Sequence, residues 1–191
     1  MKRFFLQRIV FSGLFALLTA LCPCLSTAAT RAAAPSDKVP PGWIEFDMPA
    51  ARFKVLLPVA PKTSRRTIKT DIGDVAATRY TATDDANVTY DVLLNDYPKA
   101  GVSRSNPQKL LEAVRDGLVF QTKGRTISNK QITLASHPGR DLEIMGGDGS
   151  HYRVRLVWVE TRLYQVMAVT PGKPRPDASA FFDSFQITGK P

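Results

Sequence analysis

The stretch from Arg140 to Val159 carries an alternation that fits one pairing of two β-strands. Its first half reads RDLEIM, its second half reads HYRVRLVWV, and the glycine-rich GGDG lies between them. With Gly147 to Gly149 as the loop, acids stand opposite arginines on one face, and apolar side chains meet on the other. The pairs are Glu143 with Arg153, Asp141 with Arg155, Leu142 with Val154, and Ile144 with Tyr152. A slip of one residue would mix the two faces, so the pattern predicts a hairpin in this register.

The same pairing pattern predicts a third strand. With Glu160 to Arg162 as the next loop, apolar residues again stand opposite one another on one face. The pairs are then Trp158 with Tyr164, Leu156 with Val166, and Val154 with Ala168. The sequence therefore predicts a three-stranded antiparallel meander from Arg140 to Thr170.

Five short strands are predicted earlier in the chain, because β-branched and aromatic residues recur there between turn residues. Two of the turns are Asp71–Asp74 and Asp84–Asn87. The strands span residues 43–48, 52–58, 64–70, 75–83 and 88–97, and a further strand spans residues 126–134.

A helix is predicted from Pro107 to Thr122. Leucine and valine recur there at helical spacing, Asn106 is a suitable N-cap, and proline suits the first helical position. Gly117 lies inside this helix and costs it about 1 kcal/mol relative to alanine. A short helix is predicted from Asp177, with three phenylalanines available to pack on a sheet. These elements predict a single α+β domain over residues 42–189, an antiparallel β-sheet with helices packed against it.

Residues 1–29 have the three-part pattern of a secretory signal peptide. Three positive charges, at Lys2, Arg3 and Arg8, precede an apolar run over residues 9–21, and small residues follow. This run is shorter than the roughly 20 residues that a membrane-spanning helix needs. An uncleaved N-terminal anchor is the alternative interpretation.

Small side chains predict cleavage after Ala28 or Ala29. We therefore expect an exported protein, in the periplasm or the medium, with no stable membrane span after cleavage. Residues 30–41 are rich in alanine and proline and are expected to form a flexible linker. A lipidated cysteine needs a small residue before it, but Cys22 follows a leucine and Cys24 follows a proline. Lipidation of either cysteine is therefore the less favoured alternative.

Both cysteines precede the expected cleavage site, so the mature protein would have no disulfide, thiolate metal site or cysteine nucleophile. The chain carries a net charge of +9, of which the signal peptide contributes three, leaving +6. This charge is dispersed, and solubility is its simplest role. Arg65 and Arg66 are adjacent and are the candidate surface contacts for an anionic partner. Clustered basic residues with interleaved aromatics are missing from the sequence, so we expect no nucleic-acid partner.

The sequence nominates no catalytic, cofactor-binding or metal-binding residue. The glycines of GGDG lead into a strand, whereas a phosphate-binding loop leads into a helix. His137 and His151 would lie roughly 26 Å apart along the hairpin, too far apart to share a ligand. Asp84–Asn87 lacks the twelve-residue loop of a calcium site. A G-x-S-x-G nucleophile motif is also missing.

Several segments together resemble the Mog1/PsbP-like superfamily, in particular its small exported bacterial members of unknown role. The segments are FKVLLPVAPK, NPQKLLEAVRDGL, SHPGRDLEI, RLYQVMAV and FFDSFQI. The resemblance covers about residues 43–187 and implies an antiparallel sheet with helices packed against it. Members of the superfamily bind protein partners, but the matching residues here are core and turn residues, so no site transfers residue by residue.

Three functions are compatible with these observations. The first is an exported, non-catalytic binding or accessory module whose partner is an unidentified protein or envelope component. The second is a periplasmic enzyme, of hydrolase type, with an unrecognised site at a carboxylate or at His137. The third is a binder of anionic surfaces through Arg65, Arg66, Arg153 and Arg155, which is weakened because the predicted register pairs the last two with acids. The first is preferred because the sequence offers a signal peptide and one compact domain but no catalytic constellation.

Overall fold

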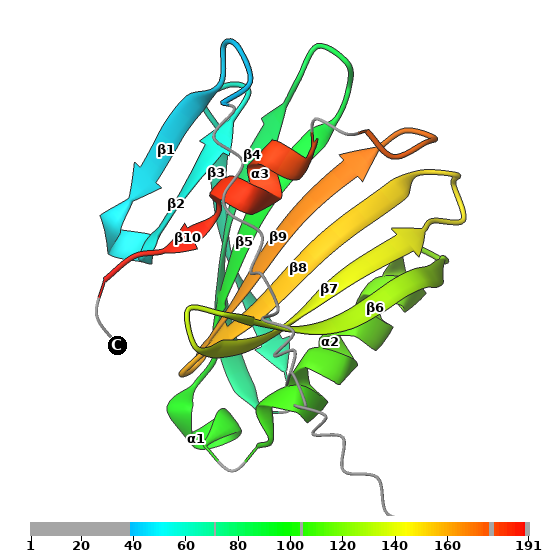
Figure 1. Cartoon of the computed structure of the whole chain (residues 1–191). Helices are drawn as coiled ribbons and strands as arrows, with labels where there is room; N and C mark the ends of the chain where they lie inside the picture. Colours follow the sequence, from blue (N-terminus) through cyan, green and yellow to red (C-terminus); the bar gives the residue numbers. More distant parts are fainter. Residues whose placement is uncertain (1–38, 71, 104, 176–177, 190–191) are drawn as a thin grey trace, which may run out of the picture. The chain divides into compact units, whose positions relative to one another are not determined.

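The computed structural model describes residues 39–70, 72–103, 105–175 and 178–189 (Figure 1). The predicted signal peptide, its cleavage sites and most of the predicted linker lie outside the described residues. Asp71 and Asp177, which the sequence places in a turn and at a helix start, lie outside them as well. Contacts between Cα atoms separate residues 1–34 from residues 35–191, and everything below concerns the second unit. The domain bounds 42–189 stay a prediction.

Seven antiparallel strands form the larger of two sheets. The predicted α+β fold is confirmed, with helices packed against antiparallel strands. In spatial order the strands are β3 (Lys62–Thr70), β4 (Gly73–Thr83), β5 (Thr89–Asp96), β9 (Arg162–Thr170), β8 (His151–Val159), β7 (His137–Met145) and β6 (Arg125–Leu134). The smaller sheet contains β1 (Ile44–Met48), β2 (Phe53–Leu57) and β10 (Gln186–Ile187).

The register of the β7–β8 hairpin is the predicted one. Glu143 stands opposite Arg153, and Leu142 stands opposite Val154. Gly149 has a φ of 80°, a backbone conformation that glycine adopts without strain. The glycine-rich stretch is therefore a turn between two strands.

The register of the next hairpin differs by one residue from the prediction. Val159 pairs with Arg162, so only Glu160 and Thr161 form the turn, and Glu160 has a φ of 55°. Trp158 consequently stands opposite Leu163 and not opposite Tyr164. The prediction was wrong because the apolar side chains of these strands are buried on both faces of the sheet, so alternation gives no information on register.

Three helices accompany the sheets. The predicted helix is α2 (Pro107–Gln121), and its N-terminus is capped as expected, since the Asn106 side chain accepts a hydrogen bond of 2.8 Å from the Gln108 backbone. The short C-terminal helix is α3 (Ala178–Ser184). The sequence reasoning missed α1 (Lys99–Val102) and a single 3-10 turn at Pro49–Ala51.

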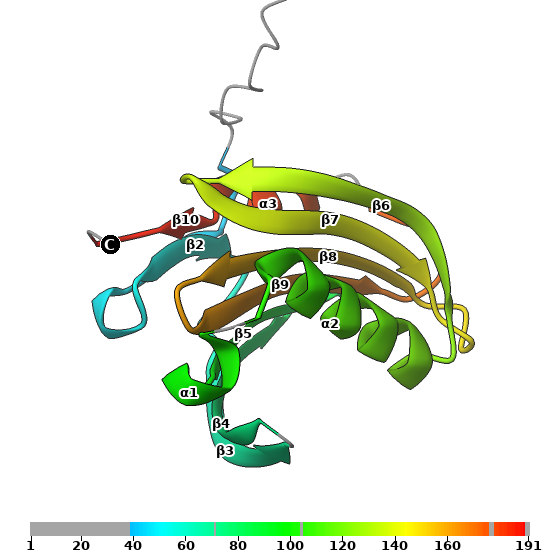
Figure 2. The ribbon, with the colours of Figure 1, turned by 90° about the horizontal axis from the view of Figure 1, so that it is seen from below.

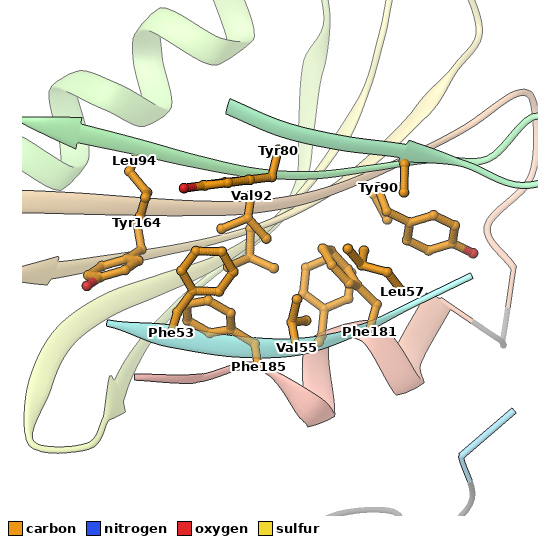
Figure 3. Packing of buried hydrophobic residues seen from close by; sticks show 14 of the residues in the cluster. Phe53, Val55, Leu57, Tyr80, Tyr90, Val92, Leu94, Tyr164, Phe181 and Phe185 are labelled. Atoms are coloured by element: carbon orange, nitrogen blue, oxygen red, sulfur yellow. The ribbon is translucent and has the colours of Figure 1, made fainter. Parts of the chain in front are cut away.

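The main core lies on one face of the seven-stranded sheet, where β2 and α3 cover it (Figure 3). Aromatic rings from both sides pack against one another in this core. Phe53 of β2 meets Tyr80 of β4 with ring centroids 5.4 Å apart, and Phe181 of α3 meets Tyr90 of β5 at 5.2 Å. Burial of such side chains is the main stabilising contribution to a fold of this size.

The second core lies on the opposite face, beneath α2. Leu111 of α2 is fully buried against a cluster that includes Leu142 of β7 and Leu156 of β8. Figure 2 shows α2 running along the sheet on this side. The β2–α3 layer and α2 therefore cover opposite faces of the sheet. The edge strand β3 remains exposed along almost its whole length.

Candidate functional site

The exposed edge strand β3 carries both candidate contact residues, Arg65 and Arg66. Lys62, Arg65, Arg66 and Lys69 lie within its nine residues, and the strand contains no acid. Asp74 stands opposite Lys69 in the register with β4. Even so, none of the four cations forms an ion pair with any residue that the structure describes. The edge therefore presents positive charge that no ion pair with a described residue neutralises.

Arg65 and Arg66, which the sequence nominates together, point to opposite faces of the sheet. Neighbours in a strand alternate between faces. In the register with β4, Arg65 stands opposite Thr78 and Arg66 stands opposite Ala77. Both arginines lie at the same edge, but only Arg66 borders the groove described next.

A groove of about 210 Å³ separates α2 from the β3–β5 part of the sheet. Its apolar lining comes from valine, leucine and isoleucine side chains. Its polar lining consists of Arg66, Thr70, Asn95, Tyr97, Gln121 and Gln165. The guanidinium is the one charged group in this lining, so the groove favours polar or anionic occupants.

Gly117 of α2 also lines the groove. A Cβ atom built on this glycine would meet nothing within 4 Å. The helix passes the sheet at a distance here, so no close approach demands glycine. A methyl group would fit in this open space, so the described residues do not explain why the position is glycine.

An ion pair between a half-exposed arginine and a buried carboxylate fixes the sheet beside the groove. Asp91 of β5 is fully buried and accepts hydrogen bonds from Arg79 Nε at 2.9 Å and from Thr81 Oγ1 at 2.6 Å. The hydrogen bond to Asp91 raises the pKa of the Arg79 guanidinium above its ordinary value. All three groups lie on adjacent strands and satisfy one another, so we regard them as structural.

Tyr97, next to the groove, packs against Trp158 with ring centroids 5.1 Å apart. Burial raises the pKa of the Tyr97 phenol, because the anionic form loses its hydration there. The phenol is therefore neutral at physiological pH and can act as a hydrogen-bond donor at the groove.

The two histidines lie in different hollows. His137 lines an open hollow of about 420 Å³ with Lys99 and Trp158. His151 lines a separate pocket of about 250 Å³ beside α3. The expectation that they do not share a site agrees with this placement, although His151 is buried, with an exposed fraction of 4%.

Within the described ranges, no group of three or more His, Cys, Asp or Glu side chains could hold a metal ion. Nor does any helix there combine the length and the apolar character that crossing a membrane requires.

Sequence reasoning missed the groove and the buried environment of His151. The groove residues Asn95, Gln121 and Gln165 come from two strands and a helix that are far apart in the chain. Amide side chains at isolated positions form no motif, so only the tertiary structure brings them together.

The sheets and helices together define an α+β fold of the PsbP type. The solution structure of cyanobacterial PsbP (CyanoP) from Synechocystis sp. PCC 6803 is similar to this chain with a TM-score of 0.51 and 11% identity, over 82% of this chain and 98% of that one. A protein of unknown function from Pseudomonas aeruginosa is similar with a TM-score of 0.35 and 9% identity, over 67% of this chain and 82% of that one. The second similarity is too low to carry an argument. Family models and curated proteins gave no match to the sequence.

Proposed function

We propose that the protein is an exported, non-catalytic binding module that holds an acidic, extended segment of a partner protein along the β3 edge. The single observation that carries this proposal is the row of four cations on β3 without carboxylate partners among the described residues. The signal peptide predicted over residues 1–29 supports export.

An edge strand can pair with an added strand, because one side of its backbone lacks partners within the sheet. Charged side chains on edges also protect proteins from unwanted pairing, which is the simpler explanation of lysines and arginines there. The other edge, β6, allows a comparison. It has ten residues but only two cations, Arg125 and Lys130. Protection against unwanted pairing does not explain why β3, the shorter edge strand, carries twice as many cations as β6.

Charge complementarity favours an acidic strand as the occupant. Positive side chains would meet glutamate or aspartate of the added strand and would repel basic segments. The adjacent groove supplies amide and phenol groups from Asn95, Gln121 and Tyr97. Such groups donate and accept hydrogen bonds but do not transfer protons at neutral pH, which supports binding over catalysis.

A peptide titration followed by NMR tests this proposal. The probe is a peptide of alternating glutamate and valine, and the control peptide alternates lysine and valine. We expect saturable shifts of the β3 backbone amides with the acidic peptide alone, weakening as salt is added. The variant Arg65→Glu/Arg66→Glu should abolish the shifts, whereas Arg125→Glu/Lys130→Glu, with the same charge change on β6, should retain them.

Three results would contradict the proposal. One is equal perturbation of β3 and β6, and another is binding that survives charge reversal on β3. The third is binding to vesicles of phosphatidylglycerol without binding to the acidic peptide, which would make the basic edge a membrane contact.

A further inference from the structure

We infer that the pocket beside α3 binds a small oxyanion, with a carboxylate or phosphate group held by Arg153. This pocket lies on the α3 face of the sheet, whereas the groove lies on the α2 face, so the inference is independent of the proposed docking edge.

The pocket has a volume of about 250 Å³ and is bounded by β7, β8, β9, α3 and the loop before α3. Its polar lining comprises Glu143, His151, Arg153, Thr170, Arg175 and Ser179. Two of these side chains, Arg153 and Arg175, are guanidinium groups and one, Glu143, is a carboxylate. This volume accommodates a phosphate ion or a short carboxylic acid.

Arg153 is held in a fixed orientation within this pocket. Its guanidinium carbon lies 4.3 Å from the centroid of the Phe182 ring, and its Nη1 donates to Ser179 Oγ at 3.2 Å. A guanidinium has five N–H donors, so most of its donors are left for another acceptor. A ring-stacked guanidinium of fixed orientation is well suited to bidentate recognition of an oxyanion.

Arg155 provides the comparison, since it projects from the same face of β8 two residues further on. Its Nε and Nη2 donate to both oxygens of Asp141, at 2.9 and 3.0 Å, and its Nη1 donates to the Phe182 carbonyl at 2.7 Å. Arg153 has no such carboxylate among the described residues, although Glu143 stands directly opposite it. Among the described residues, Arg155 thus has a carboxylate partner and Arg153 has none.

Glu143 instead lies beside His151. The Oε2 atom of Glu143 is 3.5 Å from Nε2 of His151, and this nitrogen is buried without a hydrogen-bond partner among the described residues. Buried polar atoms in native proteins are nearly always satisfied, so this nitrogen at the pocket wall is open to a polar group that enters the pocket. The pocket therefore combines a partly unsatisfied guanidinium, an unsatisfied imidazole and the Ser179 hydroxyl, whose proton is available for donation.

Titrations with inorganic phosphate and with succinate test the inference and distinguish a phosphate ligand from a carboxylate ligand. Each anion is titrated into isotope-labelled protein while the Nε–Hε resonance of Arg153 and the ring resonances of His151 are followed by NMR. We expect a saturable shift of both residues with at least one anion, and the anion that binds identifies the ligand as a phosphate or a carboxylate.

Variants then assign the site. Arg153→Lys retains the charge but loses the two-pronged geometry, and should weaken the affinity by about tenfold. His151→Gln should weaken it too, and provides a second test should the lysine variant lose stability. Lys130→Gln, on the distant edge strand β6, should bind as tightly as the original protein. Failure of both anions to saturate, or unchanged affinity in both pocket variants, would overturn the inference.

Discussion

Arg140 of β7 donates a hydrogen bond of 2.7 Å from Nη2 to Oε1 of Glu112 on α2, and this contact ties the helix to the sheet. The Arg140 side chain is only 5% exposed, whereas that of Glu112 is 46% exposed. The other contact of the guanidinium is with the neutral Asn129 side chain, at 3.1 Å. A buried positive charge therefore depends on one half-exposed carboxylate.

Glu112→Ala should destabilise the protein by about 1–3 kcal/mol, because it leaves the Arg140 charge buried without an acid. The lower part of this range is expected, since water reaches the carboxylate. Chemical denaturation measures the change in the free energy of unfolding. Asp116→Ala is the matched control on the same helix, because its exposed pairing with Arg115 should contribute less than about 0.5 kcal/mol. Equal losses in both variants would show that the buried bridge has no special role.

The two histidines should differ in their contribution to stability. His151 is buried between strands and α3, so His151→Ala should cost about 1–3 kcal/mol through lost packing. His137 is half-buried at an open hollow, and His137→Ala should change stability by no more than about 0.5 kcal/mol. Thermal unfolding of both variants checks this order. A larger loss at His137 would mean that the hollow near α1 is a structural centre.

Tyr97 should make the fold sensitive to alkali. Its pKa is raised by burial, so the folded state holds the phenolic proton to higher pH than the unfolded state does. Its contribution to stability is therefore fully present below the ordinary tyrosine value near 10 and is lost as pH rises through the raised pKa. Tyr97→Phe should reduce the fall in unfolding free energy between about pH 9 and 11. An identical pH dependence in the variant and the original protein would contradict this assignment.

Gly117→Ala should stabilise the protein by about 0.5–1 kcal/mol, because alanine favours the helix and its methyl group would enter open space. Gly139→Ala is the contrasting case. A Cβ atom at Gly139 would lie 2.4 Å from the Leu156 carbonyl oxygen, so the β7–β8 pairing would have to move apart. Denaturant midpoints of the two variants should therefore shift in opposite directions. A loss of stability in Gly117→Ala would mean that the groove closes in solution.

Export predicts a defined first residue for the mature protein. Protein recovered from the periplasm or the medium should begin at Ala29 or Thr30 when its N-terminal residues are sequenced. A product that begins with lipid-modified Cys22 or Cys24 would show a membrane-anchored lipoprotein. A product that keeps Met1 would show an uncleaved N-terminal segment.

The two hairpins of the meander show what the sequence predicts and where it fails. Between β7 and β8, one face alternates acid with arginine, so the register follows from charge alone. Between β8 and β9 both faces carry buried apolar side chains, since one faces α2 and the other faces the main core. The local sequence pattern then permits either register, and the two-residue turn at Glu160 and Thr161 fixes the observed one.

The candidate sites were harder to predict for a related reason. Arg65 and Arg66 are conspicuous as neighbours, but a strand sends adjacent side chains to opposite faces. The sequence also suggests that Arg153 is neutralised by Glu143, since the two stand opposite one another. The structure turns Glu143 toward His151 and leaves Arg153 over the Phe182 ring. Such choices depend on α3, which no local pattern connects to this hairpin.

The pairing of β10 with β2 also dictates when the molecule can fold. Gln186 stands opposite Lys54 and Ile187 opposite Phe53, so the first sheet is completed only when these distant residues reach it. Until then β1 and β2 can form no more than a two-stranded hairpin, which is marginal in water. The core between this sheet and the larger one is therefore closed by a pairing of segments far apart in the chain, so the β1–β2 hairpin waits for α3 and β10 to dock.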